Sequence, residues 1–141
     1  MKTPEIRTIG VVGTGTLGRQ IAEVAATGGL TVTLIKATGG DLSKVIAGLR
    51  SSLDRRVAKG RMDADERDLA LGRLRVTADL DELGECDLIV ESIVEYLEVN
   101  REMLSKITNI ARQDAIVASN TSTLPLAALN STALRQRFVG L

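Results

Sequence analysis

A glycine-rich loop between two short apolar strands is the feature that most restricts how this chain folds. The loop, GTGTLG at residues 13–18, follows the apolar, β-branched run Ile6–Val12, which we predict to be a buried strand. Apolar residues then recur at helical spacing as far as Gly28, where a helix ends readily, and a second β-branched strand, Thr31–Ile35, follows. Strand, helix and strand within about thirty residues form a βαβ unit, whose crossover makes the two strands parallel.

The rest of the chain continues the alternation of strands and helices. Helical spacing of apolar residues predicts helices at residues 42–57, 64–74 and 97–111, a helical turn at 79–83 and a short helix at 125–129. Short apolar runs predict further strands at residues 75–77, 87–91, 115–118 and 138–141. Asp63 and Glu66 have the spacing of a capping box at the start of the second helix in this series. We therefore expect one α/β domain over residues 1–141: a doubly wound parallel sheet of the Rossmann type, with a long helical pair inserted between strands 2 and 3.

Net charge and aromatic content argue against several kinds of partner. Lys plus Arg and Asp plus Glu each number 18, so the formal net charge is zero and gives no electrostatic case for nucleic acid or an anionic membrane. Tyr96 and Phe138 are the only aromatic residues, which leaves no stacking platform for single-stranded nucleic acid. No apolar run approaches the length of about 18 residues that a membrane span needs, and the first residues do not resemble a signal peptide. We expect a cytoplasmic protein without a membrane span.

Cysteine and histidine content restrict the chemistry further. Cys86 is the single cysteine, which excludes an intramolecular disulfide and a multi-cysteine zinc site. We expect it to pack at the start of its strand, without a redox role. The chain has no histidine, which excludes an imidazole base, nucleophile orienter or metal ligand within this sequence. We predict no metal site.

The glycine loop has two interpretations. A bare GxGxxG pattern also occurs in tight strand-to-helix turns that bind nothing. Here the loop follows a strand and opens a helix that leads to a second parallel strand, which favours a dinucleotide-binding loop. In that interpretation Gly13 permits the tight turn, Gly15 admits the pyrophosphate and Gly18 lets the helix pack closely on the sheet. Backbone N–H groups at the start of the helix then hold the phosphates.

Lys36 stands at the end of the second strand, where a carboxylate commonly accepts hydrogen bonds from the adenosine ribose. A lysine ammonium only donates hydrogen bonds, so it suits a 2′-phosphate, and therefore NADP, better than ribose hydroxyls. The alternative is a solvated loop residue, with NAD held by the other contacts. Asp41 is the nearest carboxylate, and we expect it to cap the next helix rather than to bind ribose.

The order of five segments resembles one family of enzymes. GVVGTGTLGRQIAEVAATGG, SLDRRVAKG, DLIVESIVEYLEVNREML, IVASNTSTLPL and RFVGL are together similar to the NAD-binding half of the L-3-hydroxyacyl-CoA dehydrogenases, over essentially all 141 residues. The SNTS turn after a strand, with the ESIVE segment earlier in the chain, is more specific than the glycines. Related 3-hydroxybutyryl-CoA dehydrogenases and the dehydrogenase parts of multifunctional fatty-acid oxidation enzymes share these features.

The resemblance implies roles for residues at the cofactor. The residues that it implies wrap the pyrophosphate are Gly13, Thr14, Gly15, Thr16, Leu17 and Gly18. Glu95 is implied to lie beside the nicotinamide-side ribose, and Asn100 stands where the family often has a lysine near that end of the cofactor. Ser122 matches the serine that touches both the nicotinamide and the 3-oxygen of the substrate, with Asn120 beside it in the same turn. Lys36 departs from the family's usual aspartate, which leaves the choice between NAD and NADP open.

The resemblance also assigns a substrate contact to the helical pair. Ser52 and Lys59 lie on the part of the pair that contacts the CoA moiety in the family, and the alternative is an ordinary pair on a helix surface. Without the family, Glu91 and Glu95 have the alternative of ordinary charges at a strand end and a helix start. Residues 119–122 have the alternative of a hydrogen-bonded turn and nothing more.

The reaction implied is oxidation of an L-3-hydroxyacyl-CoA to the 3-oxoacyl-CoA with reduction of NAD, as in fatty-acid metabolism. In the family a catalytic histidine follows the segment that matches residues 139–141, and a glutamate further on orients it. Neither belongs to this sequence, nor does the family's helical C-terminal domain, so we expect a cofactor-binding piece that is inactive alone, from a homodimeric parent. Two alternatives remain: a non-catalytic nucleotide-binding or sensor module, and a related dehydrogenase for a hydroxy acid that is not a CoA ester.

Overall fold

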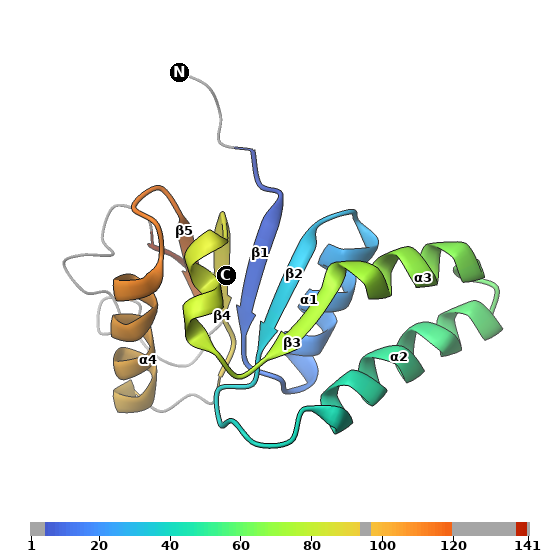
Figure 1. The fold of residues 1–141 in the computed structure, drawn as a ribbon, viewed down its shortest axis with the longest axis horizontal. Coiled ribbons are helices and arrows are strands. Elements are labelled where there is room, and N and C mark those ends of the chain that lie inside the picture. Colours follow the sequence, from blue (N-terminus) through green and yellow to red (C-terminus); the bar gives the residue numbers. More distant parts are fainter. Residues whose placement is uncertain (1–4, 94–96, 120–137, 141) are drawn as a thin grey trace.

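A parallel sheet organises the described part of the chain. The computed structural model describes residues 5–93, 97–119 and 138–140. Within these residues six strands are hydrogen-bonded in the order β3–β2–β1–β4–β5–β6, and every neighbouring pair is parallel. The strands are β1 (Thr8–Val12), β2 (Thr31–Ile35), β3 (Leu74–Thr77), β4 (Leu88–Glu91), β5 (Ile116–Ser119) and β6 (Phe138–Gly140). The strand order reverses between β1 and β4, in the middle of the sheet (Figure 1), which confirms the predicted doubly wound Rossmann fold.

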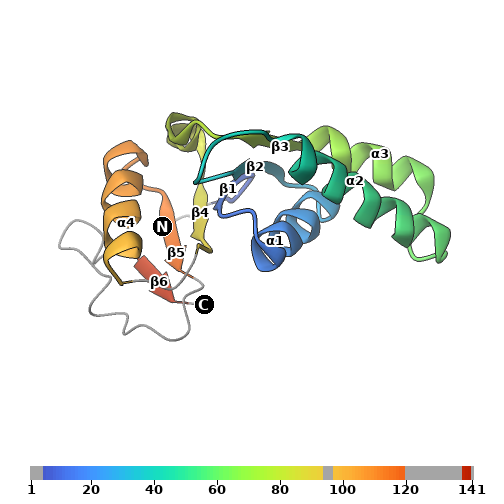
Figure 2. The same ribbon diagram turned by 90° about the horizontal axis from the view of Figure 1, so that it is seen from below.

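Helices join the consecutive strands from β1 to β5. They are α1 (Thr16–Thr27), α2 (Ser43–Ala58), α3 (Ala64–Arg73), the 3₁₀ helix η1 (Leu80–Glu85) and α4 (Leu97–Ile110). Figures 1 and 2 show α1 beside β1 and β2, and α4 beside β5. Between β2 and β3 stand two helices, α2 and α3, which extend past the β3 edge of the sheet (Figure 1).

Side chains alternate between the two faces of the sheet, so each face has its own core. In β1, Ile9 and Val11 face the layer of α1, α2 and α3, while Val12 faces η1 and α4. The buried residues of the first core are Ile9, Val11, Ala22, Ala26, Val32, Leu34, Val45, Leu49, Leu53, Met62, Ala70, Val90 and Ala118. Those of the second core are Val12, Ile35, Leu83, Cys86, Ile89, Met103, Leu104, Ile107 and Val117. The period of two along each strand thus determines which helix covers it.

Asp87 fastens the start of β1 to the start of β4. Its Oδ2 accepts the backbone N–H groups of Arg7 and Thr8 at 2.9 and 3.0 Å, and its Oδ1 accepts from the Arg112 guanidinium at 2.6 Å. The bond from the Arg7 N–H, followed by those from Arg112 and Thr8, lowers the pKa of Asp87 to about 2. The N–H of Arg7, just before the strand, thus bonds to a side chain and not to a neighbouring strand, and β1 begins at Thr8 and not at the predicted Ile6.

A side-chain cap and an ion pair define the helical pair. Asp63 accepts the backbone N–H of Glu66 at 3.2 Å and so begins α3, as the capping-box spacing predicted. Arg67 of α3 forms an ion pair with Asp54 of α2 at 3.1 Å, which links the two helices. Arg73, at the end of α3, donates to the backbone carbonyl of Ala26 in α1 at 2.9 Å.

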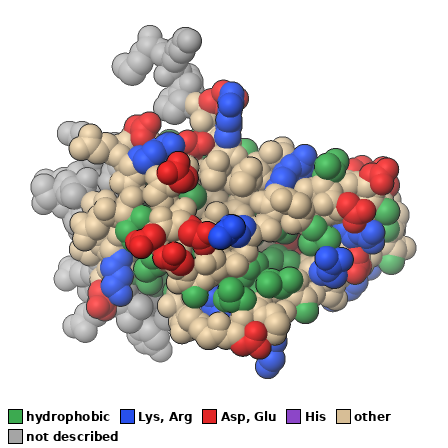
Figure 3. All heavy atoms as spheres, in the orientation of Figure 1, with side chains coloured by type: hydrophobic (Ala, Val, Ile, Leu, Met, Phe, Trp, Pro, Cys, Tyr) green, Lys and Arg blue, Asp and Glu red, His purple; other side chains and the backbone are tan. Residues whose placement is uncertain are grey.

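An apolar groove of about 170 Å³ lies where α2, α3 and β3 meet. Hydrophobic side chains gather on this part of the surface in Figure 3. The residues that line it are Ile46, Leu49, Arg50, Leu71, Leu74 and Val76.

The predicted short helix at 125–129 lies outside the described residues. None of the helices within residues 5–93 and 97–119 is long and apolar enough to cross a bilayer.

Candidate functional site

Gly13 closes the loop between β1 and α1 onto the ends of two neighbouring strands. Its N–H donates to the carbonyl of Ile35, the last residue of β2, at 2.9 Å. Its φ is +125°, a conformation that L side chains rarely adopt, and a Cβ here would lie 2.2 Å from the carbonyl oxygen of Ser92, just after β4. The loop therefore lies at the carboxyl ends of β1, β2 and β4, beside the point where the strand order reverses.

The other two glycines of the loop differ from each other. A Cβ on Gly18 would lie 2.0 Å from the carbonyl oxygen of Gly13, so the first turn of α1 packs directly on the loop. Gly15 is the N-cap of α1, with φ −70°, and a Cβ there would meet nothing within 4 Å. The space beside Gly15 is open, as the prediction that it admits a pyrophosphate requires.

The start of α1 presents backbone N–H groups to this open space. No side chain caps the helix, and its first turn carries no acidic residue. The first backbone bond of the helix runs from the N–H of Arg19 to the carbonyl of Gly15, at 3.0 Å. The N–H groups before Arg19, those of Thr16, Leu17 and Gly18, therefore have no acceptor within the helix. Such N–H groups, together with the positive end of a helix dipole, are the chemistry that attracts an anion such as a pyrophosphate.

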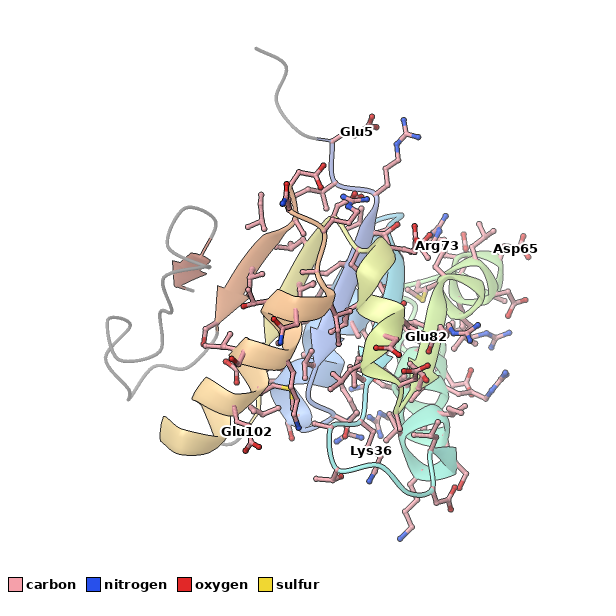
Figure 4. All side chains as sticks on the ribbon, turned by 60° about the vertical axis from the view of Figure 1, so that its left-hand side comes forward. Glu5, Lys36, Asp65, Arg73, Glu82 and Glu102 are labelled. Atoms are coloured by element: carbon pink, nitrogen blue, oxygen red, sulfur yellow. The ribbon has the colours of Figure 1, made fainter. Side chains whose placement is uncertain are left out.

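Lys36 lies directly after β2, next to the loop (Figure 4). Its backbone N–H donates to the carbonyl of Thr77 at the end of β3, at 2.9 Å. Its ammonium folds back onto the turn that follows, where it donates to Thr38 Oγ1 at 2.9 Å and to the backbone carbonyl of Gly39. The structure thus gives Lys36 local partners and leaves it half-buried, which differs from a freely solvated side chain.

Asp41 does not supply a carboxylate for the ribose. Its two oxygens accept the backbone N–H and the hydroxyl of Ser43, each at 2.9 Å. These two bonds, with a smaller contribution from the charge of Lys36, lower the pKa of Asp41. Asp41 therefore binds the first residue of α2 with both oxygens, although the N-cap position that we predicted for it is held by Leu42, which has no side-chain cap bond.

Glu91 and Ser119 form a buried pair whose contact sequence reasoning did not predict. Both side chains are fully buried, and they stand opposite each other at the ends of β4 and β5. Ser119 Oγ donates to Glu91 Oε2 at 2.6 Å, and Glu91 Oε1 accepts the backbone N–H of Ile93 at 3.2 Å. The pair fixes the segment after β4 and the end of β5 relative to each other. Polar residues at the ends of neighbouring parallel strands were the available signal, because such ends meet at one edge of the sheet.

Ser52 faces α1 and lines a small pocket beside the start of that helix. Its hydroxyl donates to Glu23 Oε2 at 3.0 Å. The pocket has a volume of about 150 Å³ and is lined by Thr16, Arg19, Gln20, Glu23, Gly48, Ser52 and Arg55. Arg19 lies so close to Gly48 that a Cβ on that glycine would be 2.7 Å from Nη1. Lys59 is the exposed C-cap of α2 and does not line this pocket, so the two predicted CoA contacts are not brought together in one pocket.

Several predicted site residues fall beyond the described side chains. Glu95, Asn120 and Ser122 lie outside the described residues, and Asn100 belongs to α4, where its side chain is not described. Within the described residues no group of three or more His, Cys, Asp or Glu side chains is placed to hold a metal ion. Cys86 is fully buried, and desolvation raises the pKa of its thiol to about 11, in keeping with its predicted structural role.

The strand order, the glycine loop at the start of α1 and its place beside the reversal between β1 and β4 define a nucleotide-binding Rossmann domain. The family model described as 3-hydroxyacyl-CoA dehydrogenase, NAD binding domain, matches residues 8–141. The chain belongs to this family, which confirms the resemblance noted in the sequence.

Individual relatives agree with this assignment. The chain is 34% identical over 137 residues to a 3-hydroxybutyryl-CoA dehydrogenase of Bradyrhizobium diazoefficiens, covering 96% of this chain and 47% of the relative. It is 36% identical over 138 residues to a 3-hydroxybutyryl-CoA dehydrogenase of Mycobacterium tuberculosis, covering 96% and 48%. The crystal structure of M. tuberculosis FadB2 matches with a TM-score of 0.91 and 35% identity, over 98% of this chain and 49% of that one. The chain spans about half the length of the curated relatives it matches.

Proposed function

We propose that this chain is the dinucleotide-binding half of an oxidoreductase that converts an L-3-hydroxyacyl-CoA to the 3-oxoacyl-CoA with NAD. The observation that carries the proposal is the open space at Gly15, where the uncapped start of α1 presents its N–H groups. The names of the relatives, 3-hydroxybutyryl-CoA dehydrogenases, support an acyl-CoA as substrate.

In this proposal the residues of the chain bind and orient the cofactor. Residues 13–18 hold the pyrophosphate, Glu95 and Asn100 lie at the nicotinamide-side ribose, and Ser122 with Asn120 positions the nicotinamide and the 3-oxygen of the substrate. Ser52 and Lys59 are the proposed contacts to the CoA moiety. A bound nicotinamide would supply an acceptor for the hydride from carbon 3, and a base would take the proton of the 3-hydroxyl.

That base is not an imidazole of this chain, because the sequence has no histidine. We therefore propose that residues 1–141 form one cofactor domain, and that a histidine and a dimerising helical domain belong to the rest of a parent protein. On this view the parent is a homodimer of the cytoplasm.

Calorimetric titration of the chain with NADH tests the binding part of this proposal. We expect saturable binding of one dinucleotide per chain. We also expect no oxidation of NADH at 340 nm with acetoacetyl-CoA, since the imidazole that transfers the proton is missing. Absence of dinucleotide binding at millimolar concentration contradicts the proposal. Turnover at the rate of a full-length relative contradicts the assignment of the proton transfer to residues outside this chain.

A further inference from the structure

We propose that Lys36 sets the choice of dinucleotide: the turn after β2 admits the 2′-phosphate of NADP(H), and the chain binds NADP(H) at least as tightly as NAD(H). The inference rests on the proposed function, because it needs a dinucleotide on the glycine loop with its adenosine ribose toward the end of β2. At the end of β2 the chain has the ammonium of Lys36 in place of a ribose-binding carboxylate.

The backbone places Lys36 where an adenosine ribose would lie. The carbonyl of the residue before it, Ile35, accepts the N–H of Gly13 in the phosphate-binding loop. Its own N–H is bonded to Thr77 at the end of β3. Lys36 is thus held between the loop and β3 at the edge of the sheet, and Figure 4 shows its side chain at this end of the sheet. A substitution at this position changes the charge next to that ribose without moving the loop.

The five residues directly after β2, residues 36–40, include no carboxylate. Asp41, the nearest acidic residue along the chain, uses both oxygens on Ser43, which directs its carboxylate toward the start of α2. Lys36 itself makes no ion pair within the described residues. Its hydrogen-bond partners are the Thr38 hydroxyl and the Gly39 carbonyl, which are neutral groups, while the Asp41 carboxylate interacts with its charge from a distance.

The turn offers hydrogen-bond donors in place of the missing acceptors. An ammonium has three donors, and Lys36 uses two of them on Thr38 and Gly39, which leaves one for a ligand. The Thr38 hydroxyl accepts from Lys36, so its own proton is free to be donated. The exposed N–H groups of Gly40 and Asp41 have no acceptor in the described part of the chain. A cation surrounded by donors suits a phosphate and leaves ribose hydroxyls with little to donate to.

Space for the phosphate is present at the same turn. Gly39 and Gly40 have φ values of +69° and +84°, and a Cβ on Gly39 would meet nothing within 4 Å. A Cβ on Gly40 would meet only the Lys36 ammonium, at 3.9 Å. The two glycines therefore leave open space beside the turn, and a phosphate can enter this space without a change in the fold.

The test compares Kd values for NAD⁺ and NADP⁺ by calorimetry on wild-type chain, Lys36→Gln and Lys36→Asp. In the wild type we expect a Kd for NADP⁺ no larger than that for NAD⁺. Removing one charge-assisted bond to the 2′-phosphate is expected to weaken NADP⁺ about ten-fold in Lys36→Gln, with little change for NAD⁺. Lys36→Asp restores an acceptor for ribose hydroxyls and is expected to favour NAD⁺. Lys44→Asp, which changes the net charge as much as Lys36→Asp does but at an exposed position of α2, is the control and leaves the ratio of the two Kd values unchanged.

Two fragments identify the phosphate that is recognised. Adenosine 2′,5′-bisphosphate is expected to bind more tightly than adenosine 3′,5′-bisphosphate, the isomer present in CoA, and Lys36→Gln removes that difference. Thermal unfolding of each variant shows whether it is folded. Tighter wild-type binding of NAD⁺ than of NADP⁺, or an unchanged ratio in folded Lys36→Gln, overturns the inference while the proposed function stands. Binding of neither dinucleotide to the wild type overturns both.

Discussion

Replacement of single glycines separates what the fold needs from what the cofactor needs. Gly15→Ala adds a methyl group where nothing lies within 4 Å, at a φ of −70° that alanine adopts freely. Gly18→Ala adds one 2.0 Å from the carbonyl oxygen of Gly13. Gly72→Ala, on the exposed side of α3 with nothing within 4 Å, is the matched control. We expect only the first variant to keep its stability and lose dinucleotide affinity.

The expected magnitudes follow from these contacts. For Gly15→Ala, the lower conformational entropy of unfolded alanine stabilises by about 0.4–1 kcal/mol, and the poorer N-cap costs a similar amount, so the net change is about zero. For Gly18→Ala, the obstacle is backbone that cannot rotate away, and overpacking of this kind costs about 1–3 kcal/mol, or roughly 10 °C in Tm at the upper end. Gly72→Ala stabilises by about 0.5–1 kcal/mol, as glycine-to-alanine changes in helices do.

Urea unfolding and NADH titration on the same three variants provide the measurements. If a phosphate approaches Gly15, the added methyl group costs about 1–3 kcal/mol of binding, a loss of roughly five- to 150-fold in affinity. Gly72→Ala is expected to bind as the wild type does. Wild-type NADH affinity in Gly15→Ala would refute the placement of the pyrophosphate, and wild-type stability in Gly18→Ala would refute the packing of α1 on the loop.

Three further predictions concern buried or hydrogen-bonded side chains. The folded pKa of Asp87 lies near 2, below its unfolded value of 3.8, so its stabilisation is complete above about pH 4 and is lost as the pH falls toward 2. Urea unfolding from pH 7 to 2.5 should therefore show a loss of at most about 2 kcal/mol that Asp87→Asn, already weakened at pH 7, does not repeat. The Cys86 thiol, with its pKa raised to about 11, should resist a disulfide reagent at pH 8 until urea unfolds the chain, whereas fast labelling in buffer contradicts its burial. Glu91→Ala removes the acceptor of the Ser119 hydroxyl and should lower the free energy of unfolding in urea by about 1–3 kcal/mol. A change below about 0.5 kcal/mol would mean that the pair contributes little to stability.

The order of strands and helices was predictable because it depends on local periodicity. A period of two in the strands and helical spacing between them determine which residues each element buries, and the two cores contain the side chains those patterns select. The start of α3 was predictable for the same reason, because the cap formed by Asp63 involves a residue only three positions later in the chain. Ends of elements were predicted less well: β3 begins at Leu74, which pairs with Val32 of the neighbouring strand, and not at the predicted Arg75.

The contacts between distant segments were not predictable in the same way. Glu91 meets Ser119 only because β4 and β5 pair in one particular register. Asp87 likewise meets the N–H groups of Arg7 and Thr8 because the starts of β1 and β4 are neighbours. The sequence predicted these residues in strands or directly beside them but contained no rule for the register, which tertiary packing sets.

The glycines of the loop are not equivalent evidence for a ligand. The fold itself requires Gly13, whose side chain would strike the backbone of Ser92, and Gly18, whose side chain would strike Gly13. Both would also be needed in a strand-to-helix turn that binds nothing. These two of the three glycines therefore indicate only that β1, β4 and α1 pack closely. Gly15 is different, because neither its φ nor its surroundings demand a glycine. A residue that the fold does not need, at the uncapped start of a helix, is the part of the motif that points to a phosphate.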